Sequence, residues 1–111
     1  MLEVSEDNSI RLTRGDTARF SVSITNDVNK QEYTMQEGDI LTLSIKKSIN
    51  DETLCLQLIA KGEASFYIKP KDTSALQFGK YIYDVQLTTA AGDVYTIIEP
   101  TTFELSKEVT T

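Results

Sequence analysis

The side chains that most enzymes use near neutral pH are scarce in this sequence. It contains no histidine, which removes the usual general base and the common ligand of zinc and copper. Its single cysteine, Cys55, lies between two leucines of an alternating apolar run. A nucleophilic thiol needs a neighbouring base or cation that lowers its pKa. We therefore interpret Cys55 as a small filler or a partly covered thiol on the strand face opposite those leucines.

Carboxylates are the remaining groups that could do chemistry, because the chain has 17 acidic residues. Two carboxylates across a cleft would suffice for glycoside hydrolysis. Most of the acids, however, lie in stretches that are typical of turns, where a carboxylate is ordinarily solvated. These are Asp7, Asp16, Asp27, Glu37, Asp39, Asp51, Glu52 and Asp93. The sequence therefore predicts no catalytic residue and no enzymatic activity, and a carboxylate-pair enzyme is the alternative that composition leaves open.

Two short motifs could bind an ion or a receptor. Asn26, Asp27, Asn29 and Glu32 offer oxygen ligands for calcium within one loop, but they lack the alternating spacing and the distal glutamate of an EF-hand. The segment 14–16, Arg-Gly-Asp, spells a cell-adhesion tripeptide, which functions at the tip of a mobile loop. Here it separates two closely spaced strands, so we expect a tight turn. The sequence predicts no metal and no cofactor.

Asp84 interrupts an apolar run on the outward face of a strand that should be central in its sheet. A carboxylate at such a position needs a partner, and Lys46 or Arg19 across the sheet would supply one. We interpret Asp84 as one half of a cross-strand ion pair, with a structural role.

Size and charge limit the remaining classes. The 111 residues suffice for one domain, 1–111, with its strands between about residues 8 and 107. A net charge of −6 without a local Lys/Arg cluster argues against nucleic acid and anionic membranes as partners. The first residues lack the basic and apolar regions of a signal peptide, and one cysteine allows no internal disulfide. We therefore expect synthesis in the cytosol.

Alternation of apolar and polar residues with period two dominates the chain and predicts strands at roughly ten-residue spacing. The spacing is typical of an all-β protein, an antiparallel β-sandwich of about seven to nine strands in two sheets. A one-turn helix is expected at 72–76 with Asp72 as its N-cap. The strands are expected at 10–13, 18–25, 33–35, 41–46, 54–59, 64–68, 81–87, 94–98 and 102–105.

Four segments carry a family resemblance: RGDTARFSVSI, GDILTLSIKK, IKPKDTSALQFGKYIYDVQL and GDVYTIIEPTTFELSKEVT. Over about residues 10–110 the chain resembles small immunoglobulin-like proteins of tailed bacteriophages and prophages, including baseplate-associated modules. The residues that anchor the resemblance are Asp72-Thr73, Leu76, Gly79, Tyr81, Tyr83-Asp84, Gly92 and Thr96-Ile97. One departure is Glu99-Pro100, where the family often has a glycine before the last strand.

The resemblance implies an immunoglobulin-like sandwich that acts as a structural or binding module of a phage tail or baseplate. Its partners would be other virion proteins or copies of itself, and the protein would be made in the bacterial cytoplasm and end in the virion. No catalytic residue is implied. The segment from Leu76 to Tyr81 is also similar to the tyrosine corner of immunoglobulin sandwiches. A free-standing adhesion or carbohydrate-binding module is the alternative, and it would need a cluster of exposed aromatic side chains.

Overall fold

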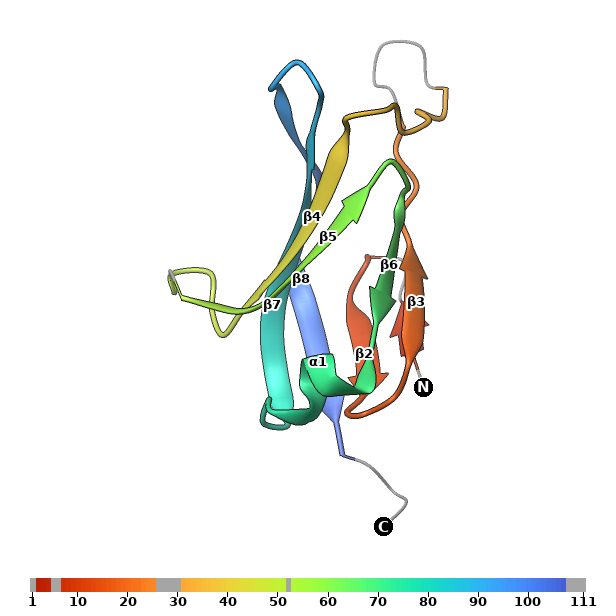
Figure 1. Ribbon diagram of the computed structural model, residues 1–111. Helices are drawn as coiled ribbons and strands as arrows, with labels where there is room; N and C mark the ends of the chain where they lie inside the picture. Colours follow the sequence, from red (N-terminus) through yellow and green to blue (C-terminus); the bar gives the residue numbers. More distant parts are fainter. Residues whose placement is uncertain (1, 5–6, 26–30, 52, 108–111) are drawn as a thin grey trace.

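The protein is mostly β in the computed structural model, which describes residues 2–4, 7–25, 31–51 and 53–107 (Figure 1). The described strands form a six-stranded sheet, in the order β1-β2-β8-β7-β4-β5, and a two-stranded sheet of β3 and β6. The larger sheet curls around the smaller one. The elements are β1 Leu2–Val4, β2 Ile10–Thr13, β3 Ala18–Ser21, β4 Ile40–Lys46, β5 Leu54–Lys61, β6 Ser65–Ile68, α1 Pro70–Ser74, β7 Gly79–Thr88 and β8 Val94–Ser106.

One strand pair is parallel, which contradicts the expectation of a purely antiparallel sandwich. β2 lies beside β8 with Ile10 opposite Phe103 and Leu12 opposite Leu105, and both strands run in the same direction. After β2 the chain turns into β3 in the other sheet, so the two strands on either side of this turn do not form a hairpin. Alternation reports which face of a strand is buried and is the same in either direction, so it could not reveal this pairing.

β8 joins two strands that were expected to be separate. It is continuous over 13 residues, and Glu99-Pro100 lies inside it. The register with β7 shifts on both sides of Val85, because Tyr83 pairs with Thr101, Val85 with Ile98 and the next residue with Thr96. These are β-bulges, in which proline is tolerated because an unpaired residue needs no ladder N–H. The departure at Glu99-Pro100 therefore kinks the strand and does not end it.

One other expected strand is shorter than the pattern suggests, and another does not form. β3 ends at Ser21, although Val22 and Ile24 remain buried and the N–H of Val22 donates to the carbonyl of Ala64 at 2.8 Å. The strand expected at 33–35 is wrong, since only an isolated bridge between Thr25 and Glu32 forms there. Burial of alternate residues is therefore preserved where the regular ladder is not.

The helix starts two residues before its predicted position. Asp72 is therefore not its N-cap, as had been expected, but lies inside the first turn. α1 begins at Pro70 with Lys69 as the N-cap, and Asp72 is the third helical residue. From there the carboxylate accepts a hydrogen bond from the N–H of Lys69 at 2.8 Å. This is the reciprocal half of a capping box. Thr73, which is fully buried, accepts a hydrogen bond from the N–H of Gly15 at 3.0 Å and ties α1 to the turn after β2.

The tyrosine corner predicted at the start of β7 is present. The hydroxyl of Tyr81 donates to the carbonyl of Gln77 at 2.8 Å, and the ring of Tyr81 is 4% exposed. Tyr81 is therefore both a core residue and a tie between the turn after α1 and the strand that follows.

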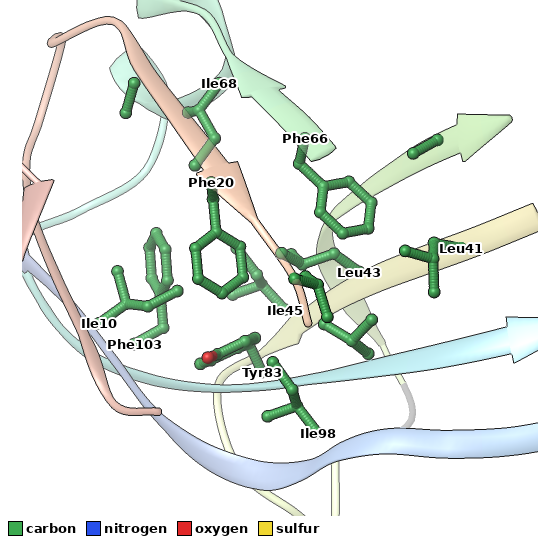
Figure 2. Packing of buried hydrophobic residues seen from close by; sticks show 14 of the residues in the cluster. Ile10, Phe20, Leu41, Leu43, Ile45, Phe66, Ile68, Tyr83, Ile98 and Phe103 are labelled. Carbon is green, nitrogen blue, oxygen red and sulfur yellow. The ribbon is translucent and has the colours of Figure 1, made fainter. Parts of the chain in front are cut away.

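The core lies between the two sheets and is centred on Tyr83 (Figure 2). Its ring makes edge-to-face contacts with Phe20 of the small sheet and Phe103 of β8, each with centroids 6.2 Å apart. The hydroxyl of Tyr83 donates to the carbonyl of Asn8, and burial raises its pKa. The other largest fully buried side chains come from both sheets and from α1. They are Phe66, Ile10, Leu12, Leu41, Leu43, Ile45, Ile68, Leu105, Val85 and Thr73.

Candidate functional site

The Arg-Gly-Asp segment forms a turn, as predicted. The N–H of Asp16 donates to the carbonyl of Thr13 at 3.1 Å, and Gly15 has a φ of +87°. The guanidinium of Arg14 donates to the carbonyl of Leu76 at 3.2 Å and lies 4.1 Å from the ring centroid of Phe78. Arg14 is thus folded against the segment after α1, and the tripeptide is not displayed at a loop tip.

Cys55 lies on β5 at a β-bulge. Ile45 of β4 pairs with Leu56 and Lys46 pairs with Leu54, so Cys55 is the extra residue between them. Cys55 is half-buried and packs against the core together with Leu56. The bulge turns Leu54 outward, where it is 42% exposed, so the two leucines beside Cys55 do not share one face of the strand as expected. The expected place of Cys55 on the face opposite those leucines is therefore wrong as well.

Asp84 lies on the outer face of the large sheet, opposite Ser44. Burial raises the pKa of its carboxyl, and the charge of Lys46 acts in the opposite direction. Lys46 therefore acts on this carboxylate through its charge, but among the described residues no ion pair joins the two side chains, so the predicted cross-strand ion pair with Lys46 does not form. The other alternative is wrong, because Arg19 lies in the small sheet with its guanidinium 4.7 Å from the ring centroid of Tyr67.

Several turn acids bond to the backbone of their own turn. Asp7 accepts hydrogen bonds from the hydroxyl and the N–H of Ser9, at 2.7 and 3.1 Å, and these bonds lower its pKa. The carboxylate of Asp51 accepts a hydrogen bond from the N–H of Thr53 at 2.9 Å. Asp7 is exposed as predicted, and both carboxylates act on local chain geometry.

Asp39 was predicted to be a solvated turn acid, and this is wrong, because it is only 2% exposed. One carboxylate oxygen accepts hydrogen bonds from the hydroxyl of Tyr33 and, at 2.9 Å, from the N–H of Gln36. The other carboxylate oxygen accepts a hydrogen bond from the N–H of Ala90 at 3.2 Å. The backbone carbonyl of Asp39 accepts one from the N–H of Gly62 at 3.1 Å. A buried carboxylate is stable where donors replace water.

We call Asp39 with these four donors the Asp39 junction. It connects the loop before β4, the turn between β5 and β6, and the turn between β7 and β8. The hydrogen bond from Tyr33 is the main cause of the lowered pKa of Asp39, and it raises the pKa of Tyr33 in turn. Gly38, beside it, has a φ of +89°, and a Cβ there would lie 2.8 Å from the Cβ of Ala90. The sequence could not reveal this junction, since Ala90 lies 51 residues away along the chain.

Most of the calcium candidate lies outside the described residues. This holds for Asn26, Asp27 and Asn29, whereas Glu32 is described and is an exposed residue at the bridge to Thr25. Within the described part of the chain, no three His, Cys, Asp or Glu side chains are grouped so that they could hold a metal ion. The helix found in that part is too short to cross a membrane.

The aromatic side chains divide between core and surface. Tyr81, Tyr83 and three of the phenylalanines are buried as predicted, but three rings are exposed: Tyr67, Phe78 and Tyr95, at 43%, 44% and 54%. Two of them carry an arginine over the ring, at Tyr67 and Phe78. These rings therefore interact with cations of the chain itself.

One feature with unused binding capacity is the outer side of β5. Within the described residues β5 pairs only with β4, so its other side is an edge of the large sheet (Figure 1). Ile59 is 57% exposed on this strand, and Leu58 is only partly covered. An edge strand offers backbone donors and acceptors to another strand. Comparison with known proteins returns no match, either to a family model or to a curated protein sequence.

Proposed function

We propose that this chain is an immunoglobulin-like, non-enzymatic module that packs against other proteins in the tail or baseplate of a phage or prophage particle. The tail setting comes from the sequence resemblance, and the mode of action from the geometry. The protein would bind through its surface, with the sheet edge at β5 as the docking strand.

The arrangement of strands around the tyrosine corner is the observation that carries the immunoglobulin-like assignment. In an immunoglobulin domain, strands B and E face strands C, F and G, and a tyrosine near the start of F bonds back to the preceding backbone. Here β3 and β6 correspond to B and E, and β4, β7 and β8 correspond to C, F and G. Tyr81 takes the place of the corner tyrosine. The parallel β2–β8 pair and the two-stranded second sheet are departures from the constant-type domain.

A binding role is supported by how the reactive side chains are used. Cys55 packs against the core, the carboxylate of Asp39 accepts hydrogen bonds from three donors, and Asp84 lies on a sheet face near Lys46. Cys55 and Asp39 therefore have structural tasks. The exposed apolar side chains of β5, in contrast, have none within the monomer.

Detection of the protein in purified particles tests the tail proposal. Particles induced from the native host would be separated on a density gradient, and fractions would be probed with an antibody to this chain and by mass spectrometry. We expect the protein to sediment with tails, while a cytosolic host protein of similar size stays at the top as the control. Recovery of this chain only at the top of the gradient contradicts the proposal.

An adhesion or carbohydrate-binding module is the second candidate, and the exposed rings of Tyr67, Phe78 and Tyr95 favour it, because sugars stack on exposed aromatic faces. Binding on a glycan array that is lost in Tyr67→Ala or Tyr95→Ala would support it. We rank it second because Arg19 and Arg14 lie over two of the three rings.

A further inference from the structure

The backbone of β5 shows which of its groups face the open edge. In an antiparallel ladder, residues that exchange hydrogen bonds with the neighbouring strand alternate with residues whose N–H and C=O point away. The N–H of Gly62 donates to the carbonyl of Asp39, and the register continues with Lys61 opposite Ile40. Alternation from this point directs the N–H and C=O of Gln57, Ile59 and Lys61 away from β4.

The side chains of the same strand are unevenly covered. Ile59 and Gln57 are exposed on the outer face of the sheet, whereas Leu56 and Leu58 face the core and remain only partly buried. β5 carries one charge, Lys61, and no proline. Edge strands that avoid pairing usually carry several charges, a proline or a bulge across their length. Here the single bulge, at Cys55, leaves the stretch from Leu56 to Lys61 regular and open to pairing.

We propose that two copies of this chain associate by antiparallel pairing of their β5 strands, with Ile59 on the two-fold axis. The three residues with free backbone groups, 57, 59 and 61, are symmetric about position 59. An antiparallel copy then places Ile59 opposite Ile59 and Gln57 opposite Lys61, and forms about six backbone hydrogen bonds. Shifting the register by two residues in either direction leaves part of this set without a partner.

The charges of β5 do not oppose a second copy at this register. The two Lys61 side chains lie at opposite ends of the paired segment, about 14 Å apart along the strands, which exceeds the screening length of about 10 Å at 0.1 M salt. Facing side chains on the core side are Leu58 and Ala60, both apolar. The exposed Ile59, at 57%, becomes covered by its own counterpart at the centre of the contact.

Sedimentation equilibrium of the full chain tests the dimer. Ile59→Lys places two like charges directly opposite each other on the axis, so we expect the dimer to dissociate at least about tenfold more readily. Val94→Lys is the matched control, because Val94 is 56% exposed and lies on β8, and it should leave the dimer unchanged. Thermal unfolding of each variant shows whether the fold is retained.

A charge-swap rescue makes the test specific for the axis. Ile59→Glu alone should weaken the dimer like Ile59→Lys, since it also opposes like charges. An equal mixture of the two variants should form a heterodimer, because opposite charges then face each other.

Oxidative cross-linking tests the register independently. In a Cys55→Ser background, Ile59→Cys should form a disulfide dimer, because directly paired residues of this type have Cα atoms about 5.5 Å apart, within disulfide range. Val94→Cys in the same background should stay monomeric under the same oxidant. A wild-type chain that is monomeric at all accessible concentrations, or a dimer that withstands Ile59→Lys, overturns the inference.

This inference rests on the proposed packing function and names its partner, but the two fail separately. A chain that dimerises as described and is absent from purified particles keeps the β5 dimer and removes the tail setting. A chain that is found in tails and is monomeric in all of these tests keeps the tail setting and removes the β5 dimer.

Discussion

Replacing Tyr81 by phenylalanine removes one hydroxyl and leaves the ring in place. The hydroxyl donates to the carbonyl of Gln77 at 2.8 Å, and the side chain is otherwise 4% exposed in the core. The substitution therefore tests whether the tyrosine corner is a stabilising tie or only a ring that fills the core.

The expected cost follows from the surroundings of the two partners. A neutral intramolecular hydrogen bond contributes about 1 kcal/mol net, and leaving a buried acceptor without a partner costs up to about 3 kcal/mol. Gln77 is an exposed residue, so water can reach its carbonyl once the hydroxyl is gone, and the lower figure applies. At about 2.1 cal/mol/K per residue, the unfolding entropy of 111 residues is about 0.23 kcal/mol/K. The melting temperature should therefore fall by about 4 °C.

Urea unfolding and differential scanning calorimetry measure this difference against Tyr95→Phe as the matched control. Tyr95 is 54% exposed, so the same loss of a hydroxyl should change the free energy of unfolding by less than about 0.5 kcal/mol. Equal stability of the two variants would refute the reasoning, because it would mean that the corner bond contributes nothing beyond what water supplies in the unfolded chain.

Three further substitutions test the loops and the sheet face. Gly38→Ala should lower the free energy of unfolding, measured in urea, by about 2–3 kcal/mol, and Gly62→Ala should lower it by about 1 kcal/mol. Both glycines have a positive φ, but only at Gly38 would the added Cβ meet the Cβ of Ala90, at 2.8 Å. Adding Ala90→Gly to Gly38→Ala should recover the difference. The lowered pKa of Asp39 means that its carboxylate stabilises the fold above the ordinary value of 3.8 and that this contribution is lost as the pH falls through the lowered value. Asp39→Asn should therefore be less stable at neutral pH and show a shallower decline on acidification. The raised pKa of Asp84 has the opposite sign, since stability is complete below 3.8 and decreases as the pH rises through the raised value. Asp84→Asn should thus be more stable than the wild type at neutral pH and equal to it in acid, and an unchanged pH profile contradicts this.

The buried face of each strand could be predicted from the sequence because alternation reports burial directly. Ile10 and Leu12, Leu41 and Leu43, and Tyr83 all lie where period two places them. The tyrosine corner was also predictable, since it depends on residues only four apart, Gln77 and Tyr81. Local patterns of this kind are determined by neighbouring residues and need no knowledge of the strand order.

The features that the sequence did not reveal depend on contacts between distant segments. The parallel β2–β8 pair joins residues about ninety positions apart, and alternation is blind to strand direction. The bulges at Cys55 and around Val85 each change the face of the residues on one side of them, which is why the outward position of Leu54 was missed. Asp39 resembled an exposed turn acid because its donor at Ala90 is supplied by another hairpin.

The polar ties at the two ends of the molecule favour the sheet edge over the loops as the proposed docking surface. At one end, Asp39 holds the loop that contains Gln36 against the β7–β8 turn at Ala90. At the other end, Thr73 of α1 holds the turn at Gly15. Backbone groups used in these bonds are satisfied within the monomer, and a partner that engaged them would have to replace bonds that already exist. The outward N–H and C=O groups of β5 have no backbone partner among the described residues, so pairing them with a second strand breaks none of the backbone bonds found there. Burial of Ile59 then adds a favourable apolar contribution to that exchange, which favours this edge over the loops at the two ends of the molecule.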